Sequence, residues 1–284
     1  MSDSSSQQHV LFAQGLYRVQ RFWGSLDNGL QFSVLSSVAV GSDSAVYCAQ
    51  RNGAPVLVFE PGGELRATWP RTVATDPHGI NIIRGTPDTV LLVDRDAHQV
   101  LHCTVNGEVI ARFGERDRPR FQAPFNHPTS AFAAPDGDVY VADGYGNSVV
   151  HRFSANGEHV STWGSPGSGD GEFSTPHSIL VDRQNRVLVV DRENCRVQVF
   201  DRNGQYIESW FGFYKPMDIT EDDSGYLYVS DQIPRVSQLS PAGTLVGRAR
   251  PVWNVPHGLA HSPDGRFFFV EMNPTSLVCL LPVA

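Results

Sequence analysis

Three histidines occupy the same position of a pattern that repeats along this 284-residue chain. Each directly follows a proline that opens an apolar run; the three are His78, His177 and His257. Three neutral imidazoles with an open fourth position are the usual ligand set of catalytic zinc sites. The same ligand type also suits iron, cobalt or manganese. The pattern therefore predicts a metal site made by the three histidines, with zinc as the expected ion.

A second repeat position, directly after an acidic residue, is rich in arginine. Its six members are Arg51, Arg95, Gly144, Arg192, Gln232 and Met272. Guanidinium groups suit bidentate binding of carboxylates, so we expect Arg51, Arg95 and Arg192 to bind a small anionic substrate, with Met272 beside them. Tyr145 lies one residue beyond this position, in the segment DGYGNS. A tyrosine near a metal and arginines is a candidate general base, so Tyr145, Arg51 and Arg192 are the predicted catalytic residues.

Internal repeats set the positions of these residues. Four segments place an acid fifteen residues after a proline: Pro128 to Asp143, Pro176 to Asp191, Pro216 to Asp231 and Pro256 to Glu271. A fifth copy, Pro77 to Asp94, has two extra residues, and a degenerate first copy runs from Leu35 to Gln50. Each copy continues with a third short strand and often a fourth. Four short strands in about 40–50 residues are typical of a β-propeller blade.

Six such copies predict an all-β fold, a six-bladed β-propeller. Histidines in copies two, four and six would then converge on the central axis from alternate blades. The last copy supplies only three strands, so we expect the segment 17–24 to complete it as the outer strand and close the ring. The predicted organisation is a flexible tail over 1–12 and a single propeller domain over 13–284.

Composition excludes several classes of function. The net charge of −8 argues against a nucleic-acid groove or a polybasic membrane patch. No apolar run reaches the length of a transmembrane helix, and the N-terminus lacks the features of a secretory signal, so we expect a cytoplasmic protein without nucleic-acid or membrane partners. Lys215 is the only lysine, which disfavours Schiff-base chemistry, and the four cysteines show no CxxC spacing.

Several segments resemble a known family. FNHPTSAFAAPDGDVYVADGYGNS, FSTPHSILVD and VVDRENCRVQVFDRNGQYI resemble NHL-type repeats and, more closely, the catalytic core of the peptidyl-α-hydroxyglycine α-amidating lyases. The resemblance implies that the three histidines bind zinc, that Tyr145 is catalytic and that Arg51 and Arg192 lie in the pocket. It implies a carbon–nitrogen lyase that splits an N-substituted α-hydroxyglycine, a carbinolamide, into glyoxylate and an amide or amine.

The chain departs from the family pattern at two glycines. Gly258 stands where the family has a calcium-binding aspartate, so the resemblance does not carry a structural Ca²⁺ site to this chain. Gly146 stands where the secreted enzymes have a disulfide-bonded cysteine beside the tyrosine. The resemblance therefore implies the zinc and the lyase chemistry, and at these two positions it gives no support for the calcium or the disulfide.

Two other classes of function share this fold. One is a metal-dependent hydrolase of the lactonase type, although those sites generally use Glu and Asn around calcium, whereas this axis offers histidine. The other is a non-catalytic NHL binding module, which gives no reason for three histidines in threefold register. Metal content separates the three: zinc favours the lyase, calcium the lactonase and no metal the module.

Overall fold

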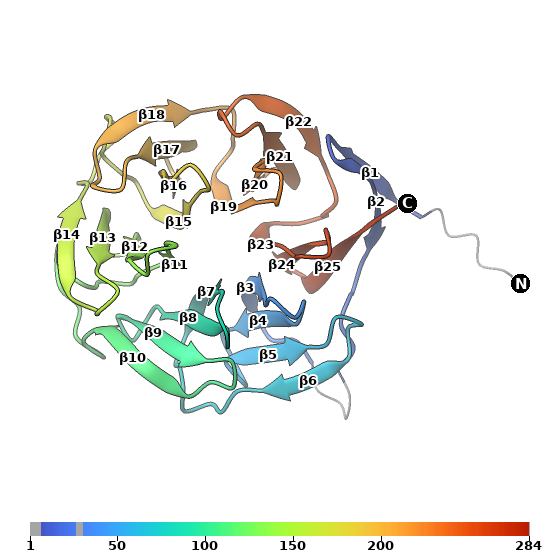
Figure 1. Cartoon of the computed structure of the whole chain (residues 1–284), viewed down its shortest axis with the longest axis horizontal. Helices are drawn as coiled ribbons and strands as arrows, with labels where there is room; N and C mark the ends of the chain where they lie inside the picture. The colour runs from blue at the N-terminus through green and yellow to red at the C-terminus, as the bar shows by residue number, and fades with distance from the viewer. Residues whose placement is uncertain (1–6, 27–30, 284) are drawn as a thin grey trace, which may run out of the picture.

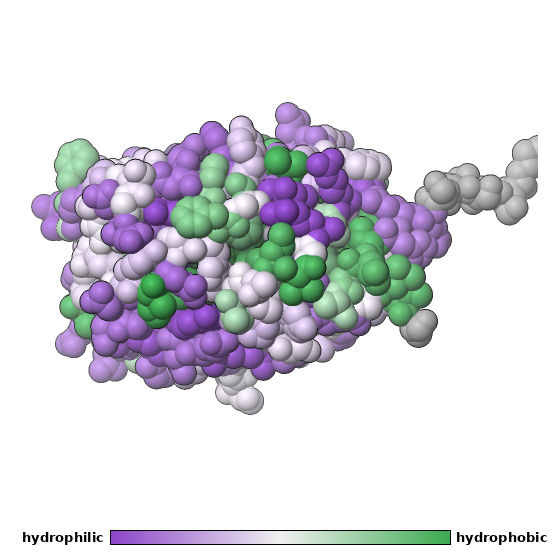
Figure 2. Space-filling view, turned by 90° about the horizontal axis from the view of Figure 1, so that it is seen from above, coloured by the Kyte–Doolittle hydropathy of each residue, from purple (hydrophilic) through white to green (hydrophobic). Residues whose placement is uncertain are grey.

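The computed structural model describes residues 7–26 and 31–283. These residues form six antiparallel sheets that stand as blades around a central axis, in the order of the sequence (Figure 1). This arrangement confirms the predicted six-bladed β-propeller. Seen from its edge, the ring is a thick disc; the side shown is largely hydrophilic, with hydrophobic side chains gathered mainly between the centre and the right of the view (Figure 2).

The first five blades each run from an inner strand at the axis to an outer strand at the rim. Blade one contains β3 (Leu35–Val40), β4 (Val46–Gln50), β5 (Val56–Phe59) and β6 (Leu65–Thr68). Blade two contains β7 (Pro77–Ile83), β8 (Thr89–Asp94), β9 (Gln99–Thr104) and β10 (Val109–Gly114). Blade three contains β11 (Ser130–Ala133), β12 (Val139–Asp143), β13 (Val149–Phe153) and β14 (His159–Trp163). Blades four and five contain β15 (Pro176–Val181), β16 (Val187–Asp191), β17 (Arg196–Phe200), β18 (Tyr206–Trp210), β19 (Pro216–Glu221), β20 (Leu227–Asp231), β21 (Arg235–Leu239) and β22 (Leu245–Ala249).

The sixth blade joins the two ends of the chain. From the axis outward it contains β23 (Pro256–His261), β24 (Phe267–Met272), β25 (Thr275–Pro282), β2 (Gly15–Gln20) and β1 (His9–Phe12). Strand β2 pairs with β25 in antiparallel register, from Tyr17 opposite Pro282 to Gln20 opposite Cys279. An N-terminal strand therefore closes the ring, as predicted, and covers the edge that β25 would otherwise expose.

The predicted boundary of the tail at residue 12 is wrong. Residues 9–12 form β1, a fifth strand that pairs with β2. Its side chains alternate between exposed and buried, and Phe12 packs against the rings of Tyr17 and Tyr228. This hairpin forms because Val10 and Phe12 gain burial on one face of the strand. Residues 1–6 of the predicted tail lie outside the described part of the chain.

The repeated acid has a structural role that explains its spacing. In the ladders of blades two, four, five and six it stands opposite the proline that opens the inner strand, as Asp191 stands opposite Pro176. Its carboxylate accepts hydrogen bonds from backbone amides of the preceding loop, as Asp94 does from Thr75 and Asp76. In blade one, the Gln50 side chain accepts the equivalent bond from a backbone amide. The acid thus fixes the loop that delivers each proline to the axis.

The hydrophobic core lies between the facing sheets of neighbouring blades. One cluster joins blades one and six through Val38 and Cys48 on one side and Phe268 and Leu277 on the other, with Trp23 packed against it. Because every blade is buried on both faces, strands such as β16 are apolar along almost their whole length. No described segment forms a helix long and apolar enough to cross a membrane.

Candidate functional site

A β-bulge at the start of the inner strand positions each histidine. The ladder of β15 with β16 shifts register between Pro176 and Ser178, so His177 has no partner opposite it. The ladders of blades two and six shift register at His78 and His257 in the same way. A bulge of this kind turns a side chain away from the regular alternation of the strand. Here the bulges turn three imidazoles toward the central axis.

The three imidazoles form a nearly equilateral triangle. Their ring centroids lie 5.0 Å apart for His78 and His177, 4.9 Å for His78 and His257, and 4.8 Å for His177 and His257. One nitrogen from each ring lies within 4.8 Å of the others, and all three residues are buried. The structure therefore brings together the three residues predicted as metal ligands.

Each histidine is oriented by the blade that follows it. The Nδ1 atom of His78 donates to the carbonyl of Thr129 at 2.7 Å, and that of His177 to the carbonyl of Met217 at 2.7 Å. The Nδ1 atom of His257 donates to the carbonyl of Ser36 at 2.6 Å. A carbonyl oxygen only accepts, so each neutral ring carries its proton on Nδ1 and keeps a free lone pair on Nε2.

Burial keeps these rings neutral. It lowers the pKa of His78 and of His177 well below the ordinary value of 6.5, and the neighbouring imidazoles lower both further. Burial also lowers the pKa of His257 to about 3, with a further contribution from the Arg51 charge. Three neutral imidazoles with fixed tautomers and converging lone pairs are the donor set that zinc prefers, so these residues fit the predicted ion.

Tyr145 lies directly over the histidines. Its hydroxyl is 3.0 Å from the Nε2 atom of His78 and 3.1 Å from that of His177. The residue belongs to the turn after β12, where the Tyr145 amide donates to the carbonyl of His127. This places a phenol oxygen within hydrogen-bond reach of two of the three nitrogens that would hold a metal.

Two arginines flank the tyrosine ring. Arg192 donates from Nη1 to the Tyr145 hydroxyl at 3.3 Å, and its guanidinium lies 5.4 Å from the ring centroid. The Arg95 guanidinium lies 5.5 Å from the same centroid. Acidic neighbours hold both side chains in place, since Arg192 pairs with Glu193 at 2.9 Å and Arg95 with Asp76 at 2.7 Å.

The other two predicted substrate-binding residues differ in their placement. Arg51 lies within electrostatic reach of the centre, because its charge lowers the pKa of all three histidines. Met272 ends β24, where its amide donates to the carbonyl of Val255. No hydrogen bond between described residues joins Met272 to the histidines or to Tyr145. Its role in binding substrate stays a prediction.

Glycines next to the site allow close contact between blades. A Cβ atom on Gly79 would lie 2.8 Å from the carbonyl oxygen of Thr129, which orients His78. A Cβ atom on Gly258 would lie 2.8 Å from the Cα of Ser37, so an aspartate does not fit here without a shift of the backbone. A Cβ atom on Gly146 would overlap the side chain of Asn126, so a cysteine does not fit here without a shift of the backbone either. Both departures from the family pattern are therefore built into the packing.

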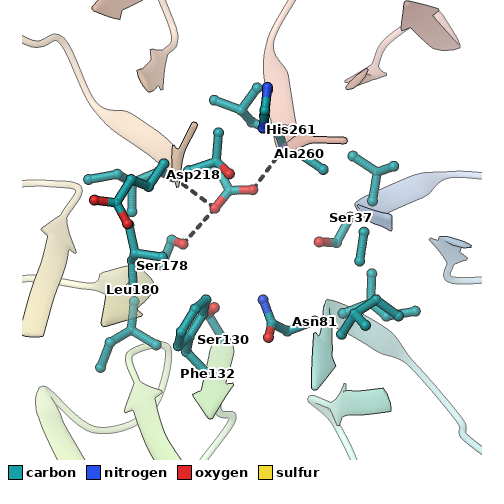
Figure 3. Close-up of a pocket in the computed structure, with 18 of the residues that line it drawn as sticks. Ser37, Asn81, Ser130, Phe132, Ser178, Leu180, Asp218, Ala260 and His261 are labelled. Carbon is teal, nitrogen blue, oxygen red and sulfur yellow. Dashed lines mark hydrogen bonds between the residues drawn. The ribbon is translucent and has the colours of Figure 1, made fainter. Parts of the chain in front are cut away.

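The central channel continues beyond the histidines into a cavity. This cavity has a volume of about 340 Å³ and is lined by the inner strands of all six blades. Figure 3 shows Ser37, Ser130 and Asp218 around its centre. The Asp218 carboxylate accepts hydrogen bonds from Ser178 at 2.6 Å and from the amide of Leu259 at 2.8 Å. Burial raises the pKa of Asp218 to about 6.

The sequence analysis did not identify the groups that orient the histidines. These groups are the carbonyls of Ser36, Thr129 and Met217, which occupy the histidine position of the repeat in the alternate blades. The repeat pattern could therefore have pointed to them. Asp218 lies one position further along the repeat, where no pattern distinguished it.

Comparisons with known proteins identify a matching family model and similar chains. A family model described as a 6-bladed beta-propeller matches residues 130–239. The mouse NHL repeat-containing protein 3 is 32% identical over 188 residues, which cover 61% of this chain and 54% of that protein. A Caenorhabditis elegans protein named "Probable peptidyl-alpha-hydroxyglycine alpha-amidating lyase" is 36% identical over 222 residues, covering 71% of this chain and 63% of that protein. The chain thus spans little more than half the length of these relatives.

A solved structure gives the same fold. A Xanthomonas campestris protein described as a gluconolactonase superimposes with a TM-score of 0.72 at 12% identity, over 99% of this chain and 96% of that one. At this identity the likeness concerns the fold alone. The sequence similarities confirm the resemblance to NHL-repeat proteins and to the α-hydroxyglycine amidating lyases.

Proposed function

We propose that this protein is a metal-dependent lyase that cleaves an N-substituted α-hydroxyglycine into glyoxylate and an amide or amine. The observation that carries the proposal is the position of the Tyr145 hydroxyl, 3.0 Å and 3.1 Å from the free nitrogens of two buried neutral histidines. The similarity to proteins named as amidating lyases supports the same reaction.

His78, His177 and His257 would hold the metal. Zinc in this position supplies Lewis acidity, which lowers the pKa of a coordinated hydroxyl group and polarises a carbonyl oxygen. The protein fixes the tautomer of each imidazole through a backbone carbonyl. Because the three imidazoles are neutral, they would leave the positive charge of a bound ion available to an anionic substrate.

The arginines bind the carboxylate of the substrate. Arg192 and Arg95 flank Tyr145, and Arg51 is close enough to act on the histidines. Guanidinium groups bind carboxylates through paired hydrogen bonds, so Arg51 and Arg192 are the main contacts. They also stabilise the negative charge that develops on the substrate oxygen during the reaction.

Tyr145 moves the proton. Its oxygen accepts the proton of the substrate hydroxyl, and Arg192 donates a hydrogen bond to the same oxygen at 3.3 Å. As the O–H bond breaks, the C–O bond becomes a carbonyl and the C–N bond breaks with its electron pair on nitrogen. The departing nitrogen takes up a proton from the tyrosine or from water, and the amide or amine product is then neutral.

Metal content and turnover, measured on the same preparation, test the proposal. We expect one zinc per chain and release of glyoxylate from N-benzoyl-α-hydroxyglycine. Bound calcium with hydrolysis of a lactone would instead identify a lactonase-type enzyme. A metal-free protein without either activity would identify a binding module, as the name of the NHL-repeat relative allows. The cytoplasmic location and the lack of a nucleic-acid partner stay predictions from the sequence.

A further inference from the structure

A basic cavity lies beside the histidine centre, over blades one and two. Its volume is about 320 Å³, within the range of small-molecule pockets. The turn after β4, the link between β6 and β7, and the loop after β10 form its wall. Its polar side chains are Arg51, Asn52, Arg71, Thr72, Thr75 and Arg116.

The positive charge of this cavity is incompletely neutralised. None of its described lining residues is acidic, although the chain carries a net charge of −8. Arg71 forms no hydrogen bond or ion pair with any described residue, and the Nε atom of Arg51 is buried without a hydrogen-bond partner. Arg116 contacts the Thr75 hydroxyl at 3.3 Å and the exposed Asp117 at 3.4 Å. These long contacts leave its guanidinium available.

The two arginines that flank Tyr145 behave differently. Arg95 is neutralised by Asp76 at 2.7 Å, and Arg192 by Glu193 at 2.9 Å. Their guanidinium groups are therefore held in place before any substrate binds. Arg51 instead keeps a buried Nε donor without a partner among the described residues, and the exposed Arg71 pairs with no described acidic group. Guanidinium groups with free donors are suited to anionic oxygen groups.

Arg51 links the cavity to the reacting centre. It lines the cavity and directly follows Gln50, which stands opposite Leu35, next to the Ser36 carbonyl that orients His257. A substrate held at the histidines therefore has this cavity within reach of the group on its nitrogen. The Thr72 and Thr75 hydroxyls and the Asn52 amide add donors around the arginines.

We infer that the group on the substrate nitrogen is acidic, and that Arg71 and Arg116 bind it. The inference rests on the proposed lyase function and specifies its substrate class. The preferred substrate is an N-acyl-α-hydroxyglycine with two negative charges. One is the carboxylate that becomes part of glyoxylate, and the other is an anionic group a few atoms beyond the amide.

A pair of substrates tests this inference. N-succinyl-α-hydroxyglycine carries the second carboxylate, whereas N-benzoyl-α-hydroxyglycine does not. We expect kcat/KM of the wild-type protein to favour the succinyl substrate by about ten-fold or more, since hydrogen bonds between charged groups are stronger than those between neutral groups. The double substitution Arg71→Ala with Arg116→Ala should remove this preference through a higher KM for the succinyl substrate. Arg183→Ala, an arginine of similar exposure at the opposite end of the channel, is the control and should retain it.

Equal kcat/KM for the two substrates, or a preference that survives the double substitution, would overturn the inference while the lyase function stands. A protein that cleaves neither substrate would refute the proposed function. The preference of the cavity for an acidic group is then tested by a binding measurement. Calorimetry with N-succinylglycine and N-benzoylglycine should show tighter binding of the former, lost in the double variant. Equal binding of the two compounds would overturn the inference in that case as well.

Discussion

The Nδ1 atom of His257 lies 2.6 Å from the carbonyl oxygen of Ser36, a residue 221 positions earlier in the chain. His257 opens the last blade and Ser36 opens the first, so this hydrogen bond crosses the seam where the ring closes. The same bond joins His78 to blade three and His177 to blade five. Every candidate metal ligand is thus oriented by the next blade, and the geometry of the site depends on a closed ring.

The close approach of neighbouring blades predicts an effect of Gly79→Ala. The added Cβ atom would lie 2.8 Å from the Thr129 carbonyl oxygen and would push it away from His78. Loss of such an orienting contact typically weakens metal binding by about 10–100-fold. We expect a drop of that size in zinc affinity, measured by competition with a chelator. Gly247→Ala is the control, because nothing lies within 4 Å of its added Cβ atom, and it should bind zinc as the wild type does.

Removal of one histidine should abolish metal binding without unfolding the protein. His177→Ala deletes one of three converging nitrogens, whereas the stability of the ring comes from the apolar faces between blades. We expect zinc content to fall from one per chain to near zero, by elemental analysis, with an unchanged β-sheet circular dichroism spectrum. His102→Ala is the control: it removes a half-buried imidazole that bonds to the Thr89 hydroxyl away from the three histidines, and it should keep its zinc. Stoichiometric zinc in His177→Ala would show that the ligand assignment is wrong.

The closure of the ring predicts the effect of N-terminal truncation. Deletion of residues 1–20 removes β1 and β2, leaves the edge of β25 unpaired and exposes the partners of Phe12 and Tyr17. Burial of each large side chain contributes about 1.5–3 kcal/mol, so we expect a fall in Tm of about 10 °C or more. Deletion of residues 1–6 keeps every described strand and is the control. Equal melting temperatures for the two deletions would contradict the closure of blade six by these strands.

The repeat made much of this architecture predictable. The interval from proline to acid corresponds to a pair of residues opposite each other in the ladder, as with Pro216 and Asp231. Each copy of the repeat forms one blade of the ring. The three histidines occupy the same position in alternate copies, and this predicted that they meet at the axis. The closing strand followed from the same count, since the last copy lacked an outer strand.

Other features of the site depend on contacts that no local pattern records. The bond from His257 to Ser36 joins opposite ends of the chain. Strand β1 is short, and the burial of Phe12 depends on Tyr228 of another blade. The free donors of Arg51 and the ion pairing of Arg95 depend on which acidic groups the loops bring near them, and loop conformation does not follow from the repeat.

The buried carboxylate in the channel predicts a pH dependence of stability. Asp218 has an ordinary pKa of 3.8 that burial raises to about 6, so the folded state binds its proton more tightly than the unfolded state does. The contribution of Asp218 to the free energy of unfolding therefore decreases as the pH rises from about 4 to about 6. The corresponding change in the free energy of unfolding is at most about 3 kcal/mol, because Asp218 lines a cavity where solvent can reduce the effect of burial.

Denaturant titrations between pH 4 and pH 7.5 measure this effect. The stability of Asp218→Asn, which cannot titrate, should rise relative to the wild type across that window. Asp223→Asn alters an exposed carboxylate that pairs with Arg183, and its stability should follow the wild-type profile. Parallel profiles for Asp218→Asn and the wild type would refute the raised pKa.

The contacts of the Tyr145 hydroxyl predict that Tyr145→Phe separates chemistry from binding. The substitution removes one oxygen, which contacts His78, His177 and Arg192, and leaves the aromatic ring between its two guanidinium groups. Removal of a positioned general base typically costs about 10²–10⁴ in rate. We expect kcat for glyoxylate release to fall by that factor, with little change in KM or in zinc content. Arg192→Ala should instead raise KM, because it removes a guanidinium group that binds the substrate carboxylate. Wild-type turnover by the Tyr145→Phe protein would exclude the phenol as the base and leave proton transfer to a water molecule at the histidine centre.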